Sequence, residues 1–344
     1  MRDFYIDDIK VGSEVPLVIP EIGINHEGDL SVAKEMVLSA HRAGAALIKH
    51  QTHVVNDEMS HAAKKVIPGN STESIYDIMN RCALSEDEEA ELKEYTEDLG
   101  MVFLSTPFSR AAADRLQRLN VKAFKIGSGE MNNYPLVEYI ASFGKPMIVS
   151  TGMNSIQSIR KTVSILERND IKYALLHTTN LYPTFPSQVR LGAMQKMMEA
   201  FNDIPIGLSD HTLNNNSCIA AIALGAKVVE RHYTDHKKRT GPDIVCSMDE
   251  NDLSELLLAA KEIPQMFGGN KDTLPEEKVT RDFAFATVVS VKPIKKGEFF
   301  TKDNLWVKRP GTGEIPAEYL KELVGKKANC DIDFDVQIKW NMVQ

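Results

Sequence analysis

The chain has 344 residues, of which 43% are hydrophobic and 26% charged, a globular composition that excludes a disordered or collagen-like chain. A single (β/α)₈ barrel takes about 250 residues, so a barrel would leave roughly 90 residues, enough for a small second domain only. With 40 Lys and Arg against 48 Asp and Glu, the formal net charge is −8. No global charge therefore attracts nucleic acid or an anionic membrane, and any attraction for an anionic ligand must be local.

The N-terminal sequence MRDFYIDDIK lacks the basic and apolar regions of a signal peptide. No apolar run approaches the roughly 20 residues of a membrane span, so we expect a cytoplasmic protein that binds neither membrane nor nucleic acid. The four cysteines, Cys82, Cys218, Cys246 and Cys330, are widely spaced and show no CxxC pattern. In that compartment they are expected to be reduced thiols, without a disulfide framework or a zinc site.

Short apolar runs alternate with longer amphipathic segments, a pattern that predicts βα units and a parallel sheet. Eight strands are predicted, at residues 17–22, 46–52, 101–106, 121–127, 145–151, 173–179, 204–210 and 226–232. Helical patterns follow them, among others at residues 30–44, 85–100, 109–120, 154–169 and 252–266. Several begin at Ser or Asn and end at Gly or Asn. Eight units are the count of an α/β (β/α)₈ TIM barrel, although periodicity alone leaves a doubly wound sheet open.

The remaining residues predict three further features. Residues 53–84 are too long for an ordinary βα loop of about 2 to 6 residues, and long loops of this kind often cover the active site of a barrel. The composition changes after the last predicted helix, which places a barrel domain at 1–267 and a Gly-, Pro- and charge-bearing linker at 268–281. Short strand-like runs broken by turn signals then predict a compact domain at 282–344.

Functional side chains of a TIM barrel gather where the C-terminal ends of its strands meet. Every predicted strand ends in polar residues: Glu21, Asn25 and His26; Lys49, His50 and Gln51; Ser105 and Thr106; Lys125 and Ser128; Ser150 and Thr151; His177 and Asn180; Ser209, Asp210 and His211; Glu230, Arg231 and His232. Such a ring is costly to bury unless its members pair with one another or with a ligand. We therefore interpret the ring as a functional site.

His211 and His232 are one βα unit apart, so they are expected to end neighbouring strands and to share a divalent metal ion. Glu230 and Asp243 are available to hold metal-bound waters or to orient the imidazoles. Two histidines leave coordination positions open for Lewis-acid catalysis, although paired histidines also serve as acid and base. The other histidines away from strand ends are expected on surfaces: His41, His53, His61 and His236.

Lys125, the Gly127-Ser128-Gly129 turn and the sequence Ser150-Thr151-Gly152 end two neighbouring strands. Hydroxyls, free backbone N–H groups and one lysine make a phosphate cradle, whereas a glycine-serine turn alone is more often only a tight turn. We expect positive charge to be confined to this mouth of the barrel. Burial near other carboxylates is expected to raise the pKa of Glu21, which favours a general acid/base role.

Blocks along nearly the whole chain resemble the sialic acid synthases, and the bacterial N-acetylneuraminate synthases more than the pseudaminic acid branch. They are EIGINHEGDL (21–30), IKHQTH (48–53), STPFS (105–109), KIGSGE (125–130), STGM (150–153), GLSDHT (207–212), ERHYT (230–234) and GPDIVCSM (241–248) in the barrel. DFAFATVV (282–289) and NLWVKRPGTG (304–313) continue the resemblance into a C-terminal antifreeze-like domain, also called a SAF or β-clip domain. The resemblance implies a TIM barrel followed by that domain.

The resemblance also implies the reaction: phosphoenolpyruvate, N-acetylmannosamine and water give N-acetylneuraminate and phosphate, with C–O cleavage and a divalent metal. Mn²⁺ is expected, with Mg²⁺ or Co²⁺ as alternatives. By carry-over, the catalytic residues are Glu21, His211, His232 and Asp243, and the metal ligands are His211 and His232, with Glu230 and Asp243 acting through water. The phosphoenolpyruvate contacts are Lys49, Thr106, Lys125, Ser128, Ser150, Asn180 and Ser209, and the sugar contacts are Gln51, Tyr182, Asp243 and Arg309.

Arg309 matches an arginine that a partner subunit's SAF domain sends into the barrel mouth, so the resemblance implies a domain-swapped homodimer. An alternative function within the family is legionaminic acid synthesis from 2,4-diacetamido-2,4,6-trideoxymannose, because one ring substituent changes only a few contacts. A more remote alternative is a metal-dependent aldolase or isomerase on the same barrel, which explains the histidines but not the phosphate cradle. A non-catalytic binding module would leave the polar ring unexplained.

Overall fold

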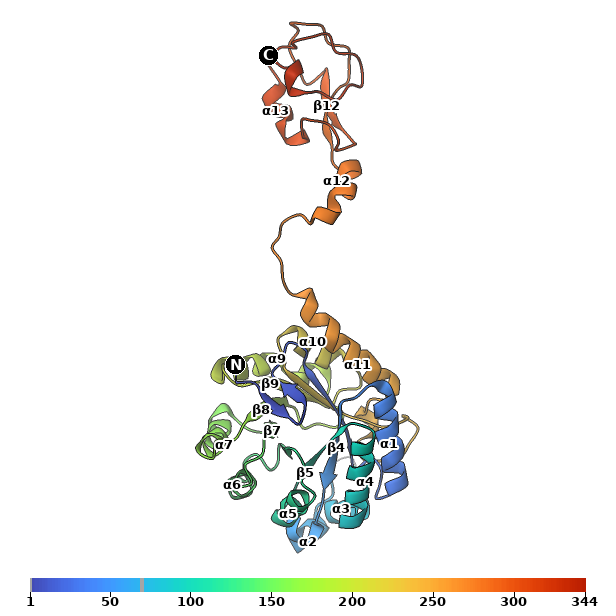
Figure 1. Cartoon of the computed structure of the whole chain (residues 1–344), viewed down its shortest axis with the longest axis vertical. Coiled ribbons are helices and arrows are strands. Elements are labelled where there is room, and N and C mark those ends of the chain that lie inside the picture. The colour runs from blue at the N-terminus through green and yellow to red at the C-terminus, as the bar shows by residue number, and fades with distance from the viewer. Residues whose placement is uncertain (1, 69–70) are drawn as a thin grey trace. The chain divides into compact units, whose positions relative to one another are not determined.

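The apolar runs predicted as strands form eight parallel strands that close into a barrel in the computed structural model (Figure 1). The structure describes residues 2–68 and 71–344. The barrel strands are β3 (Leu17–Gly23), β4 (Leu47–Thr52), β5 (Val102–Pro107), β6 (Phe124–Ile126), β7 (Met147–Ser150), β8 (Tyr173–Thr178), β9 (Ile206–Asp210) and β10 (Val228–His232). Because β10 pairs with both β9 and β3, the sheet has no open edge. This confirms the predicted TIM barrel and excludes a doubly wound sheet.

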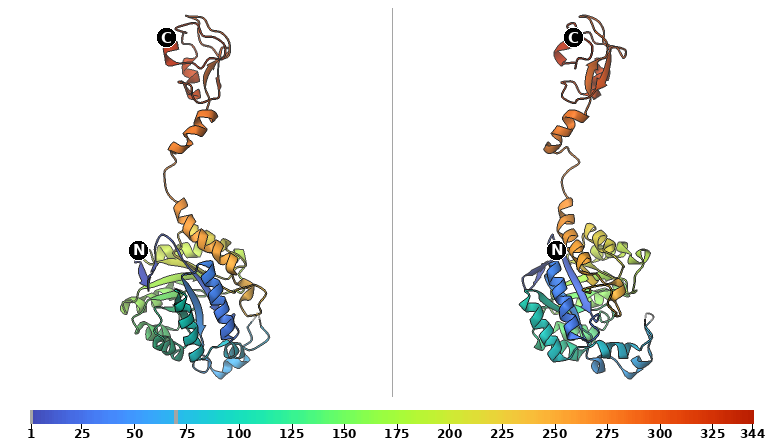
Figure 2. Two further views of the ribbon diagram at one scale, coloured as in Figure 1. Left: turned by 45° about the vertical axis from the view of Figure 1, so that its right-hand side comes forward. Right: turned by 90° about the vertical axis from the view of Figure 1, so that its right-hand side faces the viewer.

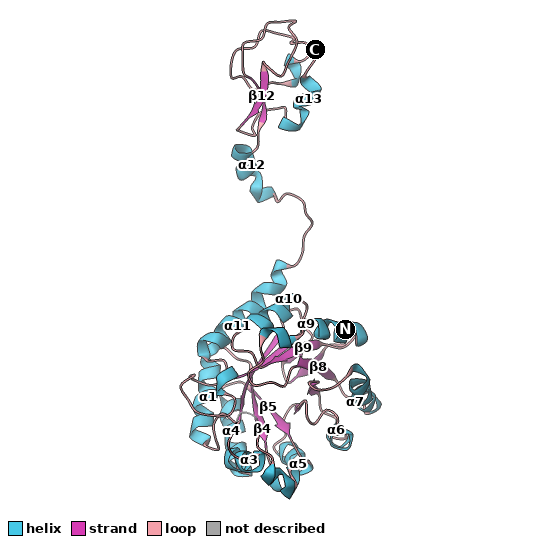
Figure 3. Cartoon of the chain, turned by 180° about the vertical axis from the view of Figure 1, so that it is seen from behind, coloured by secondary structure: helices cyan, strands magenta, loops and turns pink. Residues whose placement is uncertain are grey.

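Helices surround the strands, as the colouring by secondary structure shows (Figure 3). They are α1 (Leu30–Ala43), α2 (Val55–Glu58), α3 (Ile75–Cys82), α4 (Glu86–Asp98), α5 (Arg110–Arg118), α6 (Tyr134–Ala141), α7 (Ile156–Arg168), α8 (Pro186–Val189), α9 (Leu191–Ala200), α10 (Asn216–Ala223) and α11 (Glu250–Glu262). Their apolar faces and the outward faces of the strands form the larger hydrophobic core. Each strand of this barrel is therefore buried on both sides, which explains its nearly continuous apolar sequence.

Side-chain caps fix where several of these helices begin. Ser85 accepts a hydrogen bond from the backbone N–H of Glu88, and the Glu88 carboxylate accepts one from the backbone N–H of Ser85, which forms a capping box at the start of α4. Ser109 and Ser155 cap α5 and α7 by accepting hydrogen bonds from the backbone N–H groups of Ala112 and Ser158. Gly44 ends α1 with a left-handed φ of 95°, a conformation that a glycine adopts without strain. The predicted helix boundaries therefore rest on local chemistry.

A hairpin at the N-terminus closes one end of the barrel. Strands β1 (Phe4–Ile6) and β2 (Ile9–Val11) pair antiparallel, and Phe4, Ile6 and Val11 pack with the inward-facing apolar residues of the barrel strands. The hairpin lies at one end of the barrel and residues 53–84, in light blue, lie at the other (Figure 2). Function is therefore confined to the end that the hairpin leaves open.

Residues 53–84 contain helical turns rather than a plain loop. Helices α2 and α3 and a 3₁₀ turn (His61–Lys65) lie in this segment, and positions 69 and 70 fall outside the described residues. Ser74 caps α3 through the backbone N–H of Asp77, and Ile78 of α3 is buried against Ile24. The segment thus packs against the loop that follows β3.

Residues 268–344 form a second unit with a separate core. It contains α12 (Lys278–Ala284), the antiparallel strands β11 (Thr287–Ser290) and β12 (Leu305–Lys308), and α13 (Leu320–Leu323). Helix α12 starts inside the segment predicted as a linker. Across the described residues, none of the helices combines the length and the apolar character needed to cross a bilayer.

Truncating the hairpin plug tests its contribution to stability. Ile6 is fully buried, whereas its neighbour Tyr5 is 59% exposed. We expect Ile6→Ala to lower the free energy of unfolding by about 2–5 kcal/mol, because it leaves a cavity at the closed end of the barrel. Tyr5→Ala is the matched control and should change it by less than about 0.5 kcal/mol. Equal effects of both substitutions in urea denaturation would contradict the plug.

Candidate active site

A cavity of about 630 Å³ lies at the C-terminal ends of the barrel strands. All the site residues predicted within the barrel line it: Glu21, Lys49, Gln51, Thr106, Lys125, Ser128, Ser150, Asn180, Tyr182, Ser209, His211, Glu230, His232 and Asp243. They come from every barrel strand or the loop after it. Because parallel strands of a barrel all end at one rim, residues more than 200 positions apart meet in one place. Their individual roles stay predictions.

Two lysines and two glutamates alternate along the floor of the cavity. Lys49 Nζ forms an ion pair with Glu21 Oε1 and lies 3.8 Å from Glu230 Oε1. Lys125 Nζ lies 3.4 Å from the same Glu230 oxygen and donates a hydrogen bond of 2.7 Å to Ser150 Oγ. All four charged side chains are buried. Each charge has an opposite neighbour, which is the condition for keeping ions in a protein interior.

The protonation state of Glu21 differs from the sequence expectation. Burial by itself raises the pKa of Glu21, but the positive charges of Lys49, His232 and Lys125 outweigh burial and lower it. The expected rise is therefore wrong, because the nearest charged neighbour of Glu21 is the ammonium group of Lys49 rather than another carboxylate. Gln51 also donates a hydrogen bond of 2.8 Å to the ionised carboxylate.

Hydroxyl and amide groups surround the Lys125 ammonium group. Ser128 Oγ accepts a hydrogen bond of 3.0 Å from the backbone N–H of Gly152, and Ser209 Oγ donates one of 3.1 Å to Glu230. A Cβ atom at Gly152 would lie 1.7 Å from Asn180 Oδ1, so only glycine allows Asn180 to approach this turn. Three buried oxygens of the cavity lining have no hydrogen-bond partner among the described residues, namely Asn180 Oδ1, Thr106 Oγ1 and Glu230 Oε2. Polar groups of this kind remain free for a ligand.

The two strand-end histidines face each other across the cavity wall. Their ring centroids are 5.5 Å apart, and the His211 ring stacks on Tyr182 at 4.1 Å. Burial lowers the pKa of His211 to about 3, so this ring is neutral. Its Nδ1 donates a hydrogen bond of 2.8 Å to the carbonyl oxygen of Thr179, which leaves the lone pair on Nε2. His211 is therefore held in the tautomer that suits a metal ligand.

His232 lies between two carboxylates. Its Nε2 is 3.7 Å from Glu21 Oε2, its Nδ1 is 3.7 Å from Asp243 Oδ2, and that Nδ1 has no hydrogen-bond partner among the described residues. Burial raises the pKa of Asp243. Within residues 2–68 and 71–344, no group of three or more His, Cys, Asp or Glu side chains has the geometry to hold a metal ion by itself. A divalent ion here would need water or substrate oxygens as further ligands.

Several polar strand-end residues point away from the cavity, since successive side chains of a strand face opposite sides. Asp210 and Arg231 form a buried ion pair of 3.2 Å outside the barrel, where Arg231 also donates to Asn215. His177 makes a hydrogen bond of 2.8 Å with the carbonyl oxygen of Val189. His50 contacts Glu89 of α4. These four side chains pair with the protein and belong to the layer between strands and helices.

Sequence reasoning missed several lining residues: His53, Glu58, Phe108, Glu130 and Met153. His53 was expected on a surface, and this is wrong: it is 4% exposed, stacks on Phe108 at 4.4 Å and binds Glu58 at 2.8 Å. Its burial depends on where residues 53–84 fold, which no local pattern reports. The expected surface positions of His41, His61 and His236 are confirmed.

The expected excess of positive charge at the mouth is also wrong. The lining residues include two lysines but five carboxyl groups, those of Glu21, Glu58, Glu130, Glu230 and Asp243. The two lysines are already paired with glutamates. For an anionic ligand, this cavity would therefore gain from an additional cation, although its hydroxyl groups remain available as donors.

Arg309, the remaining predicted sugar contact, belongs to the second unit. It follows β12 directly and is exposed. The structure therefore leaves its guanidinium group free for a ligand or another surface.

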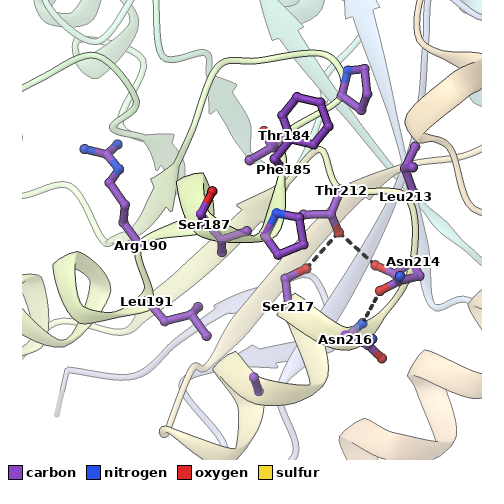
Figure 4. A pocket seen from close by; sticks show the side chains of 14 residues that line it. Thr184, Phe185, Ser187, Arg190, Leu191, Thr212, Leu213, Asn214, Asn216 and Ser217 are labelled. Carbon is purple, nitrogen blue, oxygen red and sulfur yellow. Dashed lines mark hydrogen bonds between the residues drawn. The ribbon is translucent and has the colours of Figure 1, made fainter.

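A second hollow of about 550 Å³ lies between the segment after β8 and the start of α10 (Figure 4). Phe185, Leu191 and Leu213 give it an apolar wall, and Arg190 is the single ionisable side chain among its lining residues. Thr212 donates hydrogen bonds within this wall to Asn214 and pairs with Ser217. Without a second charged or nucleophilic group, this hollow offers no catalytic chemistry.

The fold and the lined cavity define a TIM-barrel enzyme with its site at the C-terminal ends of the strands. Comparison with known proteins gives the particular family. The model of the NeuB family matches residues 36–272, and that of the SAF domain matches residues 285–344. The chain therefore belongs to the NeuB family, the sialic acid-type synthases, and carries a C-terminal SAF domain, as the sequence resemblance predicted.

Relatives named for different products are about equally similar to this chain. The N,N'-diacetyllegionaminic acid synthase of Campylobacter jejuni is 36% identical over 331 residues, 94% of this chain and 98% of that protein. The N-acetylneuraminate-9-phosphate synthase of Homo sapiens is 34% identical over 338 residues, 97% of this chain and 94% of that protein. The crystal structure of the N-acetylneuraminic acid synthetase of Leptospira borgpetersenii, in complex with citrate, superposes with a TM-score of 0.73 at 27% identity, covering 81% of this chain and 95% of that chain.

Glu130 makes the stability of the folded chain depend on pH. Burial raises its pKa from 4.5 to about 7. Between these values the folded state holds a proton that the unfolded chain has lost, so stability falls as the pH rises from about 4.5 to 7. Glu130→Gln removes this titration. Relative to the natural chain, the variant should gain about 1 to 3 kcal/mol in unfolding free energy between pH 5 and pH 8 in urea titrations. A pH-independent difference would contradict the raised pKa.

Proposed function

We propose that this chain condenses phosphoenolpyruvate with N-acetylmannosamine and water to give N-acetylneuraminate and phosphate. One observation carries the proposal: a lysine surrounded by hydroxyls and a neutral imidazole facing a second imidazole line the same cavity. The first group suits a phosphate and the second suits the activation of a carbonyl. Phosphate and carbonyl are the reacting groups of the two substrates.

We further propose that His211 and His232 hold a divalent ion, Mn²⁺ first and Mg²⁺ or Co²⁺ as alternatives. The free Nε2 of His211, the unpartnered Nδ1 of His232 and the excess of carboxylates support a cation at this place. Glu230 and Asp243 line the same cavity and would orient the waters bound to the ion. When bound, such an ion supplies Lewis acidity to the sugar aldehyde.

The remaining groups divide between the two substrates. Lys125, with Ser128, Ser150 and Ser209, would hold the phosphate, while the unpaired Thr106 hydroxyl and the N–H of the Asn180 amide would donate to the rest of phosphoenolpyruvate. C3 of phosphoenolpyruvate then forms a C–C bond to C1 of the open-chain sugar. Water adds to the resulting cation at C2, and the adduct collapses with cleavage of the C2–O bond and loss of phosphate.

Glu21 is proposed to move the proton that this sequence requires. Lys49 keeps Glu21 ionised, so the carboxylate enters the reaction as a base and takes a proton from the attacking water or from a sugar hydroxyl. Gln51 fixes the orientation of the carboxylate. Tyr182 and Asp243, which line the same cavity, would contact the sugar.

A second acceptor, 2,4-diacetamido-2,4,6-trideoxymannose, is supported by a specific feature of the cavity. Residues 53–84 contribute an apolar wall that consists of Met59, Pro68, Ile75, Ile78 and Met79. This sugar carries an additional acetamido methyl and a C6 methyl, which gain from contact with apolar surface. The 36% identity to a legionaminic acid synthase agrees with this candidate.

A phosphate-release assay with phosphoenolpyruvate and each purified sugar tests the function and separates the two acceptors. We expect release only when a sugar is present, and loss of release after chelation that added Mn²⁺ restores. The sugar with the larger kcat/KM is the acceptor. Phosphate release that needs no acceptor, or none with either sugar, would refute the proposal.

The proton-transfer residue and the metal ligand are tested by Glu21→Gln and His232→Ala. Each should lower kcat by about 100- to 10,000-fold while circular dichroism and melting temperature stay close to those of the natural chain. Glu27→Gln is the matched control, since Glu27 is on the loop that follows the strand of Glu21 but binds Arg81 rather than the cavity groups. Phosphate release by either variant at the rate of the natural chain would contradict the assignment.

We propose a domain-swapped homodimer in which Arg309 of one chain completes the cavity of the other. Apolar side chains stand exposed at both hollows of the barrel: Met153 lines the cavity and is 74% exposed, and Phe185 and Leu213 line the second hollow and are 64% and 57% exposed. The second unit exposes Trp306 and Phe334 as well. Apolar patches on both units support an interface between two copies of this chain.

Complementation between two inactive chains tests the proposed role of Arg309. Glu21→Gln and Arg309→Ala chains are co-expressed with different tags, and the doubly tagged dimer is isolated. In the swapped arrangement one of its two cavities is intact, so we expect roughly half of the natural activity. The control dimer of Glu21→Gln with His232→Ala should stay inactive. An inactive first dimer, or a fully active monomer, would refute the arrangement.

A further inference from the structure

The outward face of β4 carries buried polar groups that the proposed reaction does not use. Lys49 and Gln51 of this strand face the cavity, and the alternating residues His50 and Thr52 face helices α4 and α5. A polar pair in this otherwise apolar layer is costly unless it is fully hydrogen-bonded. The hydrogen bonds of His50 and Thr52 therefore indicate which parts of the structure this pair connects.

Glu89 of α4 is the centre of these contacts. Its carboxylate is fully buried, lies 3.2 Å from His50 Nδ1, accepts a short hydrogen bond from Thr52 Oγ1 and pairs with Arg115 of α5 at 3.1 Å. Burial alone raises the pKa of Glu89, but these partners, His50 foremost, lower it. An ionised carboxylate only accepts hydrogen bonds, so His50 carries its proton on Nδ1.

The stacked rings of His26 and His50 have complementary nitrogen atoms. Their centroids are 5.3 Å apart, and the Nε2 atoms of both rings are buried without a hydrogen-bond partner in the described part of the chain. Nδ1 of His26 accepts a hydrogen bond of 3.1 Å from the backbone N–H of Gly28, so its Nε2 carries the proton. Burial lowers the pKa of His26 to about 3, with the carbonyl of Gly23 opposing the shift. A neutral His50 has its lone pair on Nε2, which matches this donor.

The strand that carries Glu21 is irregular next to this residue. Glu21 pairs with Lys49 and Gly23 pairs with His50, so the ladder between β3 and β4 shifts register between Glu21 and Gly23. A bulge breaks the regular hydrogen bonds and bends the strand, which leaves the direction of nearby side chains to other contacts. His50 stands opposite this bulge, and His26 lies on the loop that follows it.

We propose that Arg115, Glu89, His50 and His26 form a buried relay that positions Glu21 and Lys49 for catalysis. The Nε2 atoms of two stacked rings lie in their ring planes and do not point at each other, so a direct hydrogen bond between them is not formed. In this relay, Nε2–H of His26 donates to one water molecule, and that water donates to Nε2 of His50. All four are positioning residues, since none lines the cavity. Because neutral His26 carries its hydrogen on Nε2, this nitrogen has no lone pair for a metal ion, which argues against a second metal site here. The role in catalysis rests on the proposed function, whereas the relay itself does not.

The tautomers are measured first, on the complete natural chain labelled with ¹⁵N-histidine. Two-bond ¹⁵N–¹H correlation spectra should show neutral His26 with its proton on Nε2 and neutral His50 with its proton on Nδ1, assigned through His26→Asn and His50→Asn. An imidazolium at His50, or the opposite tautomer at either ring, would overturn the relay. This measurement does not depend on catalysis or on the identity of the substrates.

A double-mutant cycle tests whether the two rings act together. Asn retains an acceptor or donor near the position of Nδ1 and removes Nε2, so His26→Asn and His50→Asn each remove one end of the link. Each should lower kcat about tenfold, with KM for phosphoenolpyruvate changed less than twofold, and the double variant should lose no more than either single variant. His41→Asn, the same substitution at an exposed histidine of α1, should leave kcat unchanged.

The outcomes separate the relay from the proposed function. Multiplicative losses of about 100-fold in the double variant would show that the rings act independently, for example with His26 bound to the carbonyl of Gly23, and would refute the relay. A change confined to KM would refute the positioning role. If the natural chain releases no phosphate, the proposed function fails, and the same cycle read as melting temperatures still decides whether the rings are coupled.

Discussion

The buried row of alternating charges Glu21, Lys49, Glu230 and Lys125 constrains the rest of this molecule. Four ions inside a barrel are tolerated only if each one lies next to an opposite charge, and distances of 3.8 Å and 3.4 Å around Glu230 meet that condition. The four side chains come from four different strands. The charges can therefore pair only when the barrel has closed in the correct register.

The same pairing determines the chemistry that the cavity can support. Lys49 keeps Glu21 ionised despite its burial, and Lys125 keeps a donor for Ser150 beside hydroxyls that suit an anion. The imidazole of His211 is neutral because burial and the neighbouring His232 lower its pKa more than Glu21 raises it. An ionised carboxylate, a lysine beside hydroxyls and a neutral imidazole thus coexist within one cavity through differences in their nearest neighbours.

Much of the fold and of the site was predictable from the sequence. Strand ranges followed from apolar runs, and helix starts such as Ser85 followed from capping chemistry, because both signals are local. The barrel rule then placed Lys125 and His211 at one rim. The inward burial of His53 and the pKa of Glu21 were predicted wrongly, since each depends on contacts with residues distant in the chain.

The sequence by itself determined the βα periodicity, the polar residue types at the strand ends and the family, since these are carried by residue types and their spacing. Only the tertiary structure decided which of two adjacent polar residues faces the cavity: Lys49 lines it, whereas His50 binds Glu89 behind it. The physical reason is the twofold alternation of a strand, which fixes that neighbours face opposite ways but not which one faces inward. Closure of the barrel makes that choice.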